Sequence, residues 1–226
     1  MSNSDFTISH DKPKGEIIDL GCCPEEGEAQ EGTSDGYAGI PVPVKKLDTK
    51  SESFEWHVET MVEKFDGDYT AQEIAEQGIK PVEVVKVGGN MVLTAGIQRL
   101  IDQFIGATTA PFNNTNARLG VGNSNTAASA GQTDLQASAG AGNRQFKVMD
   151  ATYPLRSSQT MTFKSTFASG EAQFAWLEIG IDRGTADGTT VTAPLFSRKV
   201  PSGGLGTKGA VAWALTISIT PTSTGP

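Results

Sequence analysis

The sequence of 226 residues predicts a mainly β protein: an antiparallel β-sandwich with one amphipathic helix and a long extended N-terminal arm. Short segments of alternating apolar residues recur between turns from residue 117 onward, which is typical of sandwich strands. A single helical stripe precedes them, and the first 50 residues carry few large apolar side chains. We therefore divide the chain into an acidic arm (1–50), a linker or attachment region with a short helix and a strand (51–90), and a sandwich domain (91–226).

The arm is rich in Gly, Pro, Asp, Glu and Ser, so by itself it cannot bury enough apolar surface to offset the entropy lost on ordering. It is either a disordered tail or an arm that becomes ordered by lying along a neighbouring subunit. Residues 1–90 hold 19 acidic and 8 basic side chains, whereas residues 91–226 hold 7 and 10. This asymmetry indicates two segments with different roles. Neither half has the dense basic face that nucleic-acid binding requires.

The region between the arm and the sandwich contains a short helix and a strand. Apolar residues between 54 and 65 alternate at first and then recur at helical spacing, so both a strand and a helix stay open there. Thr70 and Glu73 fit the capping box of a short helix that ends near Gly78. Residues 81–87 are rich in β-branched side chains and lie between a proline and a Gly-Gly-Asn turn, which predicts a strand.

The amphipathic helix is expected to begin with Thr94 as its cap and to end at Gly106. Its apolar residues fall at positions i, i+3, i+4, i+7 and i+8 and form one stripe: Ile97, Leu100, Ile101, Phe104 and Ile105. Such a stripe usually faces the core of a protein. We therefore expect it to pack against a sheet.

The strands of the sandwich, five to seven in number, follow the helix. Alternation or apolar runs place them in five segments: 117–121, 146–148, 161–167, 172–181 and 211–219. The segment 172–181 is apolar on both faces, as expected of a central strand that is covered on two sides. A turn at 184–188 leads to Pro194-Leu195-Phe196. The edges of such an open sheet invite partners.

The chain offers little for catalysis, and we name no catalytic, cofactor-binding or metal-ligating residue. Its only histidines, His10 and His57, lie far from each other and from its only cysteines, Cys22 and Cys23. A Ser/His/Asp or Cys/His arrangement is therefore not expected in the sandwich domain. Adjacent cysteines rarely bridge, so no disulfide framework and no zinc site is expected, and the role of this pair stays open. The sequence has neither a transmembrane run nor a visible secretory signal.

Two patterns in the sandwich domain resemble functional motifs. The stretch 120–126 resembles a phosphate loop but lacks its lysine, which favours a Gly-rich β-turn. The acids of the strand region are Glu171, Glu178, Asp182 and Asp187. A glycosidase needs such acids as a pair across a cleft, but a structural ion pair of Glu178 with Arg183 or Arg198 is favoured. Calcium bound by Asp182 and Asp187 is a lesser alternative.

Two smaller expectations concern the loop and the tryptophans. Asp134 is expected to cap or close a turn. Trp176 and Trp213 lie in strongly apolar segments and are expected in the core. A glycan-binding module would instead need one of them exposed, or a groove lined by the loop 122–136.

Several motifs occur together in one order. A helix LTAGIQRLIDQFIGA is followed by ARLGVGNSNTAASAGQTDLQ, a strand block MTFKSTFASGEAQFAWLEIGI, then LFSRKV and SGGLGTKGAVAWALTISITP. The set covers residues 91–220 and resembles a widespread group of tailed-bacteriophage virion proteins. The resemblance implies a non-enzymatic structural component of the virion. Members of the group decorate heads or belong to tails and fibres.

The resemblance and the composition together lead to one expected function. We expect a capsid-exterior decoration or accessory protein, not an enzyme, that docks by its arm and displays the sandwich. Its expected partners are the major capsid protein or other virion subunits and further copies of itself, as a trimer or dimer, without cofactor, nucleic acid or membrane. It would assemble into the virion in the host bacterial cytoplasm. A tail, neck or fibre protein and a glycan-binding adhesion module are the alternatives, and the expected interfaces are the segment 15–65 and then the loop 122–136.

Overall fold

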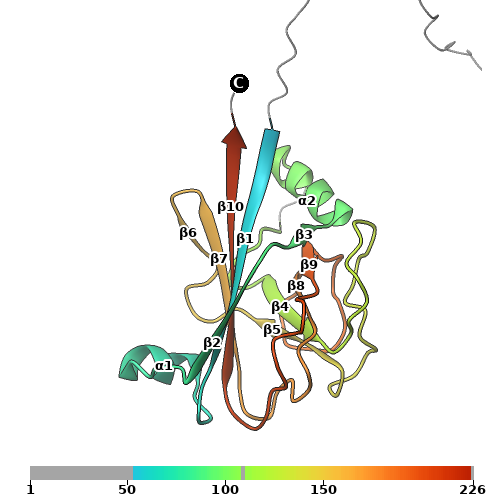
Figure 1. The fold of residues 1–226 in the computed structure, drawn as a ribbon. Coiled ribbons are helices and arrows are strands. Elements are labelled where there is room, and N and C mark those ends of the chain that lie inside the picture. The colour runs from blue at the N-terminus through green and yellow to red at the C-terminus, as the bar shows by residue number, and fades with distance from the viewer. Residues whose placement is uncertain (1–52, 108–109, 225–226) are drawn as a thin grey trace, which may run out of the picture. The chain divides into compact units, whose positions relative to one another are not determined.

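The structure is a computed structural model that describes residues 53–107 and 110–224. Two antiparallel five-stranded sheets make up the fold (Figure 1), in the orders β2-β1-β10-β7-β6 and β3-β9-β8-β4-β5. Buried apolar side chains from both sheets join in one core, so the sheets form a sandwich. The expected mainly β sandwich is confirmed. The expected arm (1–50) lies outside the described residues.

The elements of the fold are as follows. The first sheet contains β1 (Ser53–Lys64), β2 (Glu83–Gly88), β6 (Leu155–Ser157), β7 (Thr160–Phe167) and β10 (Trp213–Thr224). The second sheet contains β3 (Met91–Val92), β4 (Ala117–Gly122), β5 (Arg144–Val148), β8 (Glu178–Arg183) and β9 (Ser197–Lys199). The two described helices are α1 (Ala71–Gln77) and α2 (Thr94–Phe104).

Two strands from the expected linker region 51–90, β1 and β2, belong to the first sheet of the sandwich, so the sandwich includes residues before position 91. β1 pairs with β10 along its whole length and with β2 on its other side. The alternation that begins at Phe54 continues through the buried residues Val58, Thr60 and Val62. Thr60 is polar although it lies at a buried position, and Met61 is apolar although it lies on the opposite face of the strand. For this reason the apolar residues from 58 to 65 have helical spacing in the sequence. The segment 54–65, for which the sequence leaves both a strand and a helix open, is therefore a strand as far as Lys64.

The short helix α1 has the expected capping box. The Glu73 amide donates to the Thr70 hydroxyl at 3.2 Å, and the Thr70 amide donates to the Glu73 carboxylate at 2.9 Å. The helix ends at Gly78, whose φ of 63° is a left-handed conformation that glycine adopts without strain. The prediction of this helix is confirmed, because its start and stop signals are local in the sequence.

The core between the sheets contains the two tryptophans. Trp176 is fully buried and Trp213 is 4% exposed, which confirms that both belong to the core. The ring of Trp176 meets Phe167 and Trp213 edge-on, with centroids 4.9 Å and 5.0 Å apart. The expected strand 172–181 is shorter than predicted, because only Glu178–Arg183 is a strand. The residues before it are irregular, although the Trp176 backbone exchanges hydrogen bonds with the segment 205–206.

A second apolar layer covers the outer face of the second sheet. The long loop after β4 folds back onto this face, where Leu135 packs against Phe146 and Leu195. Gly120 and Gly180 lie opposite each other in β4 and β8. A Cβ atom at Gly120 would lie 2.6 Å from the Phe146 ring. Of the Gly-rich stretch 120–126, residues 120–122 are therefore the end of strand β4, where glycine permits the close contact with Phe146, and residues 123–126 are irregular. The β-turn expected from the sequence does not include residues 120–122.

A buried lysine near the end of the sandwich makes stability depend on pH. The Lys208 side chain is 2% exposed, and its ammonium donates to the Ala168 carbonyl at 2.6 Å. Burial lowers the pKa of Lys208 from 10.5 to about 8, and Glu171 and Asp68 only partly offset this. Between pH 8 and pH 10.5 the unfolded chain therefore binds more protons at this site than the folded chain, so stability rises with pH.

We expect the contribution of Lys208 to raise the free energy of unfolding by about 1 kcal/mol between pH 7 and pH 9. Urea denaturation at the two pH values would measure it. Lys208→Met is the comparison, because groups that titrate elsewhere in the chain are the same in both proteins. Equal pH dependence in the wild type and the variant would contradict the expectation.

Candidate docking surface

The helix α2 is held against the sandwich by one narrow side. The amide of Leu93, its N-cap residue, donates to the Phe196 carbonyl at 3.0 Å, and the Leu93 side chain is fully buried. A Cβ atom at Gly96 would lie 2.1 Å from the Phe196 oxygen, so only glycine permits this approach. Arg99 donates to the Pro194 carbonyl at 3.0 Å. The expected cap, Thr94, is instead the first helical residue.

The apolar stripe of α2 faces away from the core. Phe104 is 93% exposed, Ile105 68%, Ile101 54% and Ile97 47%. Only Leu100 of the stripe packs against the core. The expectation that the stripe is core is therefore wrong for four of its five residues. The close contact at Gly96 is the physical reason, because it turns a different side of the helix toward the sandwich.

The exposed stripe is large for a protein surface. Side chains of this size offer roughly 100 Å² each at these exposures, so the four together present on the order of 400 Å² of apolar surface. A contiguous apolar patch of this extent is often a site of interaction. The helical pattern in the sequence indicated the apolar face correctly but contained no information about what covers it.

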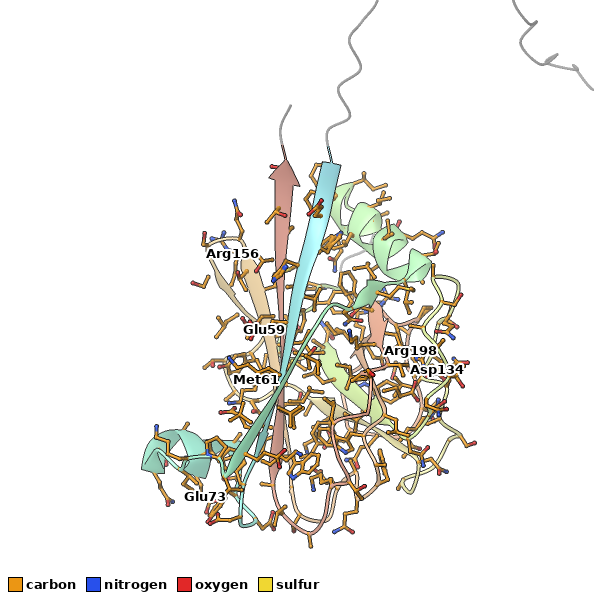
Figure 2. The ribbon with its side chains drawn as sticks, viewed as in Figure 1. Glu59, Met61, Glu73, Asp134, Arg156 and Arg198 are labelled. Carbon is orange, nitrogen blue, oxygen red and sulfur yellow. The ribbon has the colours of Figure 1, made fainter. Side chains whose placement is uncertain are left out.

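An apolar groove lies beside the stripe, between α2 and the strands β6 and β7. Its volume is about 300 Å³, and its apolar lining includes Leu100, Phe112, Leu155, Met161, Phe163 and Phe196. Phe112 stands edge-on to Phe196 and Phe163, with centroids 5.6 Å and 6.4 Å apart. Arg156, labelled in Figure 2, is a lining residue from β6. Leu100 belongs to both the stripe and the groove lining, so the two apolar surfaces adjoin at α2, and together they are called the docking surface.

The carboxylate of Glu178 lies in a buried ion pair. Both Glu178 and Arg198 are fully buried, and their nearest charged atoms are 2.6 Å apart. The carboxylate also accepts hydrogen bonds from the amides of Gln136 at 2.9 Å and Ala137 at 2.7 Å. Arg198 donates to the carbonyl of Thr126 and the side chain of Gln132. The pair therefore holds the loop after β4 on the sheet, and the favoured partner of Glu178 is Arg198.

The other acids considered in the sequence analysis are each paired with a basic side chain. Asp182 is fully buried and pairs with Arg118, a partner that the sequence pattern did not indicate. Asp187 bonds Lys147 at 2.8 Å, and Glu171 bonds the same lysine at 2.6 Å. Asp182 and Asp187 are thus held by different cations and do not form a calcium site. Within residues 53–107 and 110–224, no group of three or more His, Cys, Asp or Glu side chains could hold a metal ion.

The expected interfaces have different places in the structure. Of the segment 15–65, residues 53–65 are described, and they form β1 and its end; Phe54 there is 61% exposed. In the loop 122–136, Asp134 forms an ion pair with Arg144 at 2.8 Å and accepts from the Leu135 amide at 2.7 Å. Asp134 and Arg198 both lie on the side of the second sheet (Figure 2). The end of the loop around Asp134 therefore belongs to the cover of the second sheet, whereas Asn125, Ala127 and Ala128 line an open pocket beside Met91 and Lys199.

Comparison with known proteins finds no matching family model, no matching curated protein and no matching solved structure. In the part of the chain that the structure describes, no helix is long and apolar enough to cross a membrane. The residues with the clearest functional geometry are those of α2 and the groove. Sequence periodicity found the stripe, whereas the groove residues come from segments far apart in the chain and carried no local signal.

Proposed function

We propose that the chain is a non-enzymatic structural subunit of a tailed-bacteriophage virion, placed on the capsid exterior as a decoration or accessory protein. The observation that carries the proposal is the exposed apolar stripe of α2 beside an apolar groove. The order of motifs between residues 91 and 220 supports the choice of virion. The partners are the major capsid protein or other virion subunits and further copies of this chain.

The docking surface supplies a favourable apolar contribution to assembly. Removing on the order of 400 Å² of apolar surface from water releases about 10 kcal/mol before the costs of association are subtracted. The loss of translational and rotational freedom and the ordering of side chains offset a large part of this free energy. Those costs fall when many neighbours are fixed in a lattice, because the effective concentration of partners is high.

The burial of the ionisable side chains also supports a structural role. Glu178 and Asp182 are each fully buried against an arginine. A pair of carboxylates working as acid and base must reach a substrate across a cleft. These two side chains instead fasten loops to the second sheet. Trp176 and Trp213, which a glycan site would use, are buried. The loop 122–136 does line an open pocket, through Asn125, Ala127 and Ala128, and among the described residues this pocket is the one observation on the side of the glycan-binding alternative.

The copy number of the chain in purified particles tests the proposal. Quantitative mass spectrometry against the major shell protein should give one copy, or one third of a copy, per shell subunit if the chain decorates the capsid. A ratio of a few per hundred would move it to the tail or neck. Absence of the chain from washed particles would refute the virion assignment, and the shell protein in the same digest is the internal control.

A further inference from the structure

We propose that the docking surface binds a second copy of this chain, with Phe104 of each copy inserted into the groove of the other. The inference rests on the proposed function in one respect: it names one partner of the surface already described. It concerns pairing of free chains in solution and does not depend on which part of a particle carries them.

Phe104 has the geometry of an inserted side chain. It is the last residue of α2 and is 93% exposed, and the next residue, Ile105, is 68% exposed. Phenylalanine is one of the aromatic residues that contribute most to binding energy when an interface buries them. The ring and the neighbouring isoleucine project from the end of the helix beside the groove.

The groove has the size and the lining for such an insert. Its volume of about 300 Å³ is at the lower end of those that hold small organic ligands, which leaves room for an aromatic ring and one aliphatic side chain. Phe112 lies in its wall and already makes edge-on contacts with two other phenylalanines. A further ring entering from outside would extend this arrangement, which aromatic side chains prefer.

The inserted residue and the groove are adjacent on the same helix, which favours a second copy over another protein. Leu100 and Gln103 line the groove, and Phe104 follows directly. A two-fold axis near α2 would therefore bring each Phe104 to the partner copy's groove and satisfy both sites at once, as an isologous interface requires. A different protein would need its own matching side chain and cavity.

The apolar area of the docking surface and the charges of α2 are consistent with a second copy of the chain as the partner. A stable interface buries roughly 800 Å² per partner, and the α2 stripe supplies on the order of half of it. The rim of the groove, including Leu155 at 38% exposed, supplies more. Of the two charged residues of α2, Arg99 is directed to the Pro194 carbonyl, and Asp102 alone is exposed. Two such helices can therefore meet with little repulsion. Arg156 at the groove is the charged side chain that an acidic partner could use instead.

Sedimentation equilibrium of the full chain tests the pairing. The wild type should have twice the 23.7 kDa mass of the chain. Phe104→Lys should raise the dissociation constant at least ~30-fold, because it places a positive charge in an apolar groove that Arg156 also lines, on both copies. Val82→Lys is the matched control, since Val82 is 66% exposed and lies between α1 and β2, and it should leave the dissociation constant unchanged. A wild type that is a monomer or a trimer, or a Phe104→Lys variant that pairs normally, would overturn the inference.

Disulfide crosslinking tests the reciprocal arrangement. In a chain with Cys22→Ser and Cys23→Ser, one sample carries Phe104→Cys and a second carries Leu155→Cys. Mixing the two should give a disulfide between positions 104 and 155. Crosslinks that form only between two copies of position 104 would overturn the proposed insertion. Thermal unfolding of each variant checks that the fold is intact, which is expected because both side chains are exposed.

Discussion

Replacing Glu178 with alanine should lower the free energy of unfolding by about 3–5 kcal/mol, because it leaves the buried charge of Arg198 without its partner. Glu178 is fully buried and receives two hydrogen bonds from backbone amides as well as the ion pair. Alanine supplies no acceptor for any of these donors, and an unsatisfied buried donor costs more than its hydrogen bond contributed. The loop after β4 would lose its attachment to the sheet.

Chemical denaturation of three variants would measure the effect. Glu59→Ala is the control, because Glu59 pairs with Lys86 at 3.5 Å on the exposed face of β1 and such pairs contribute about 0–1 kcal/mol. The double variant Glu178→Leu with Arg198→Met should recover much of the loss, since it removes both buried charges together. A Glu178→Ala protein as stable as the Glu59→Ala protein would contradict the structural role of the pair.

The sequence predicts well those elements whose signals are local. β7 and β10 follow from strict alternation, and α1 follows from the pair Thr70 and Glu73, three residues apart. The pattern of β1 fits both a strand and a helix because one buried position holds Thr60. Its pairing with β10 along the whole length decides in favour of a strand. A polar residue at one inward position obscures the period when an apolar residue stands next to it on the outward face, as Met61 does in β1. In β7 the inward Ser165 has polar neighbours, so the alternation stays clear.

The docking surface and the ion pairs depend on contacts between distant segments. The helical spacing of α2 predicted an apolar stripe, but its exposure is decided by the contact of Gly96 with Phe196, a hundred residues later. Arg118 and Asp182 are 64 residues apart, and no pattern along the chain connects them. A single sequence lists the side chains, whereas pairing across the sheets decides which of them meet.

Replacing Trp176 with alanine should destabilise the protein by about 3–5 kcal/mol, as the removal of a fully buried large aromatic side chain does. The indole is fully buried, and its Nε1 donates to the Ala172 carbonyl at 3.0 Å. Alanine would leave a cavity between Phe167 and Trp213 and would remove one of the two hydrogen bonds that the Ala172 carbonyl accepts. Trp176→Phe keeps much of the ring and loses the hydrogen bond, so we expect a smaller loss of about 1–3 kcal/mol.

Urea denaturation distinguishes this structural role from a ligand-binding one. Phe54→Ala is the control, because Phe54 is an aromatic residue that is 61% exposed, and its loss should cost less than about 1 kcal/mol. If the ring of Trp176 serves the core, stability falls in the order wild type, Trp176→Phe, Trp176→Ala. A Trp176→Ala protein with unchanged stability and lost adhesion to glycan-coated surfaces would instead place the ring in a binding site. The burial of the indole between both sheets is the reason to expect the first result.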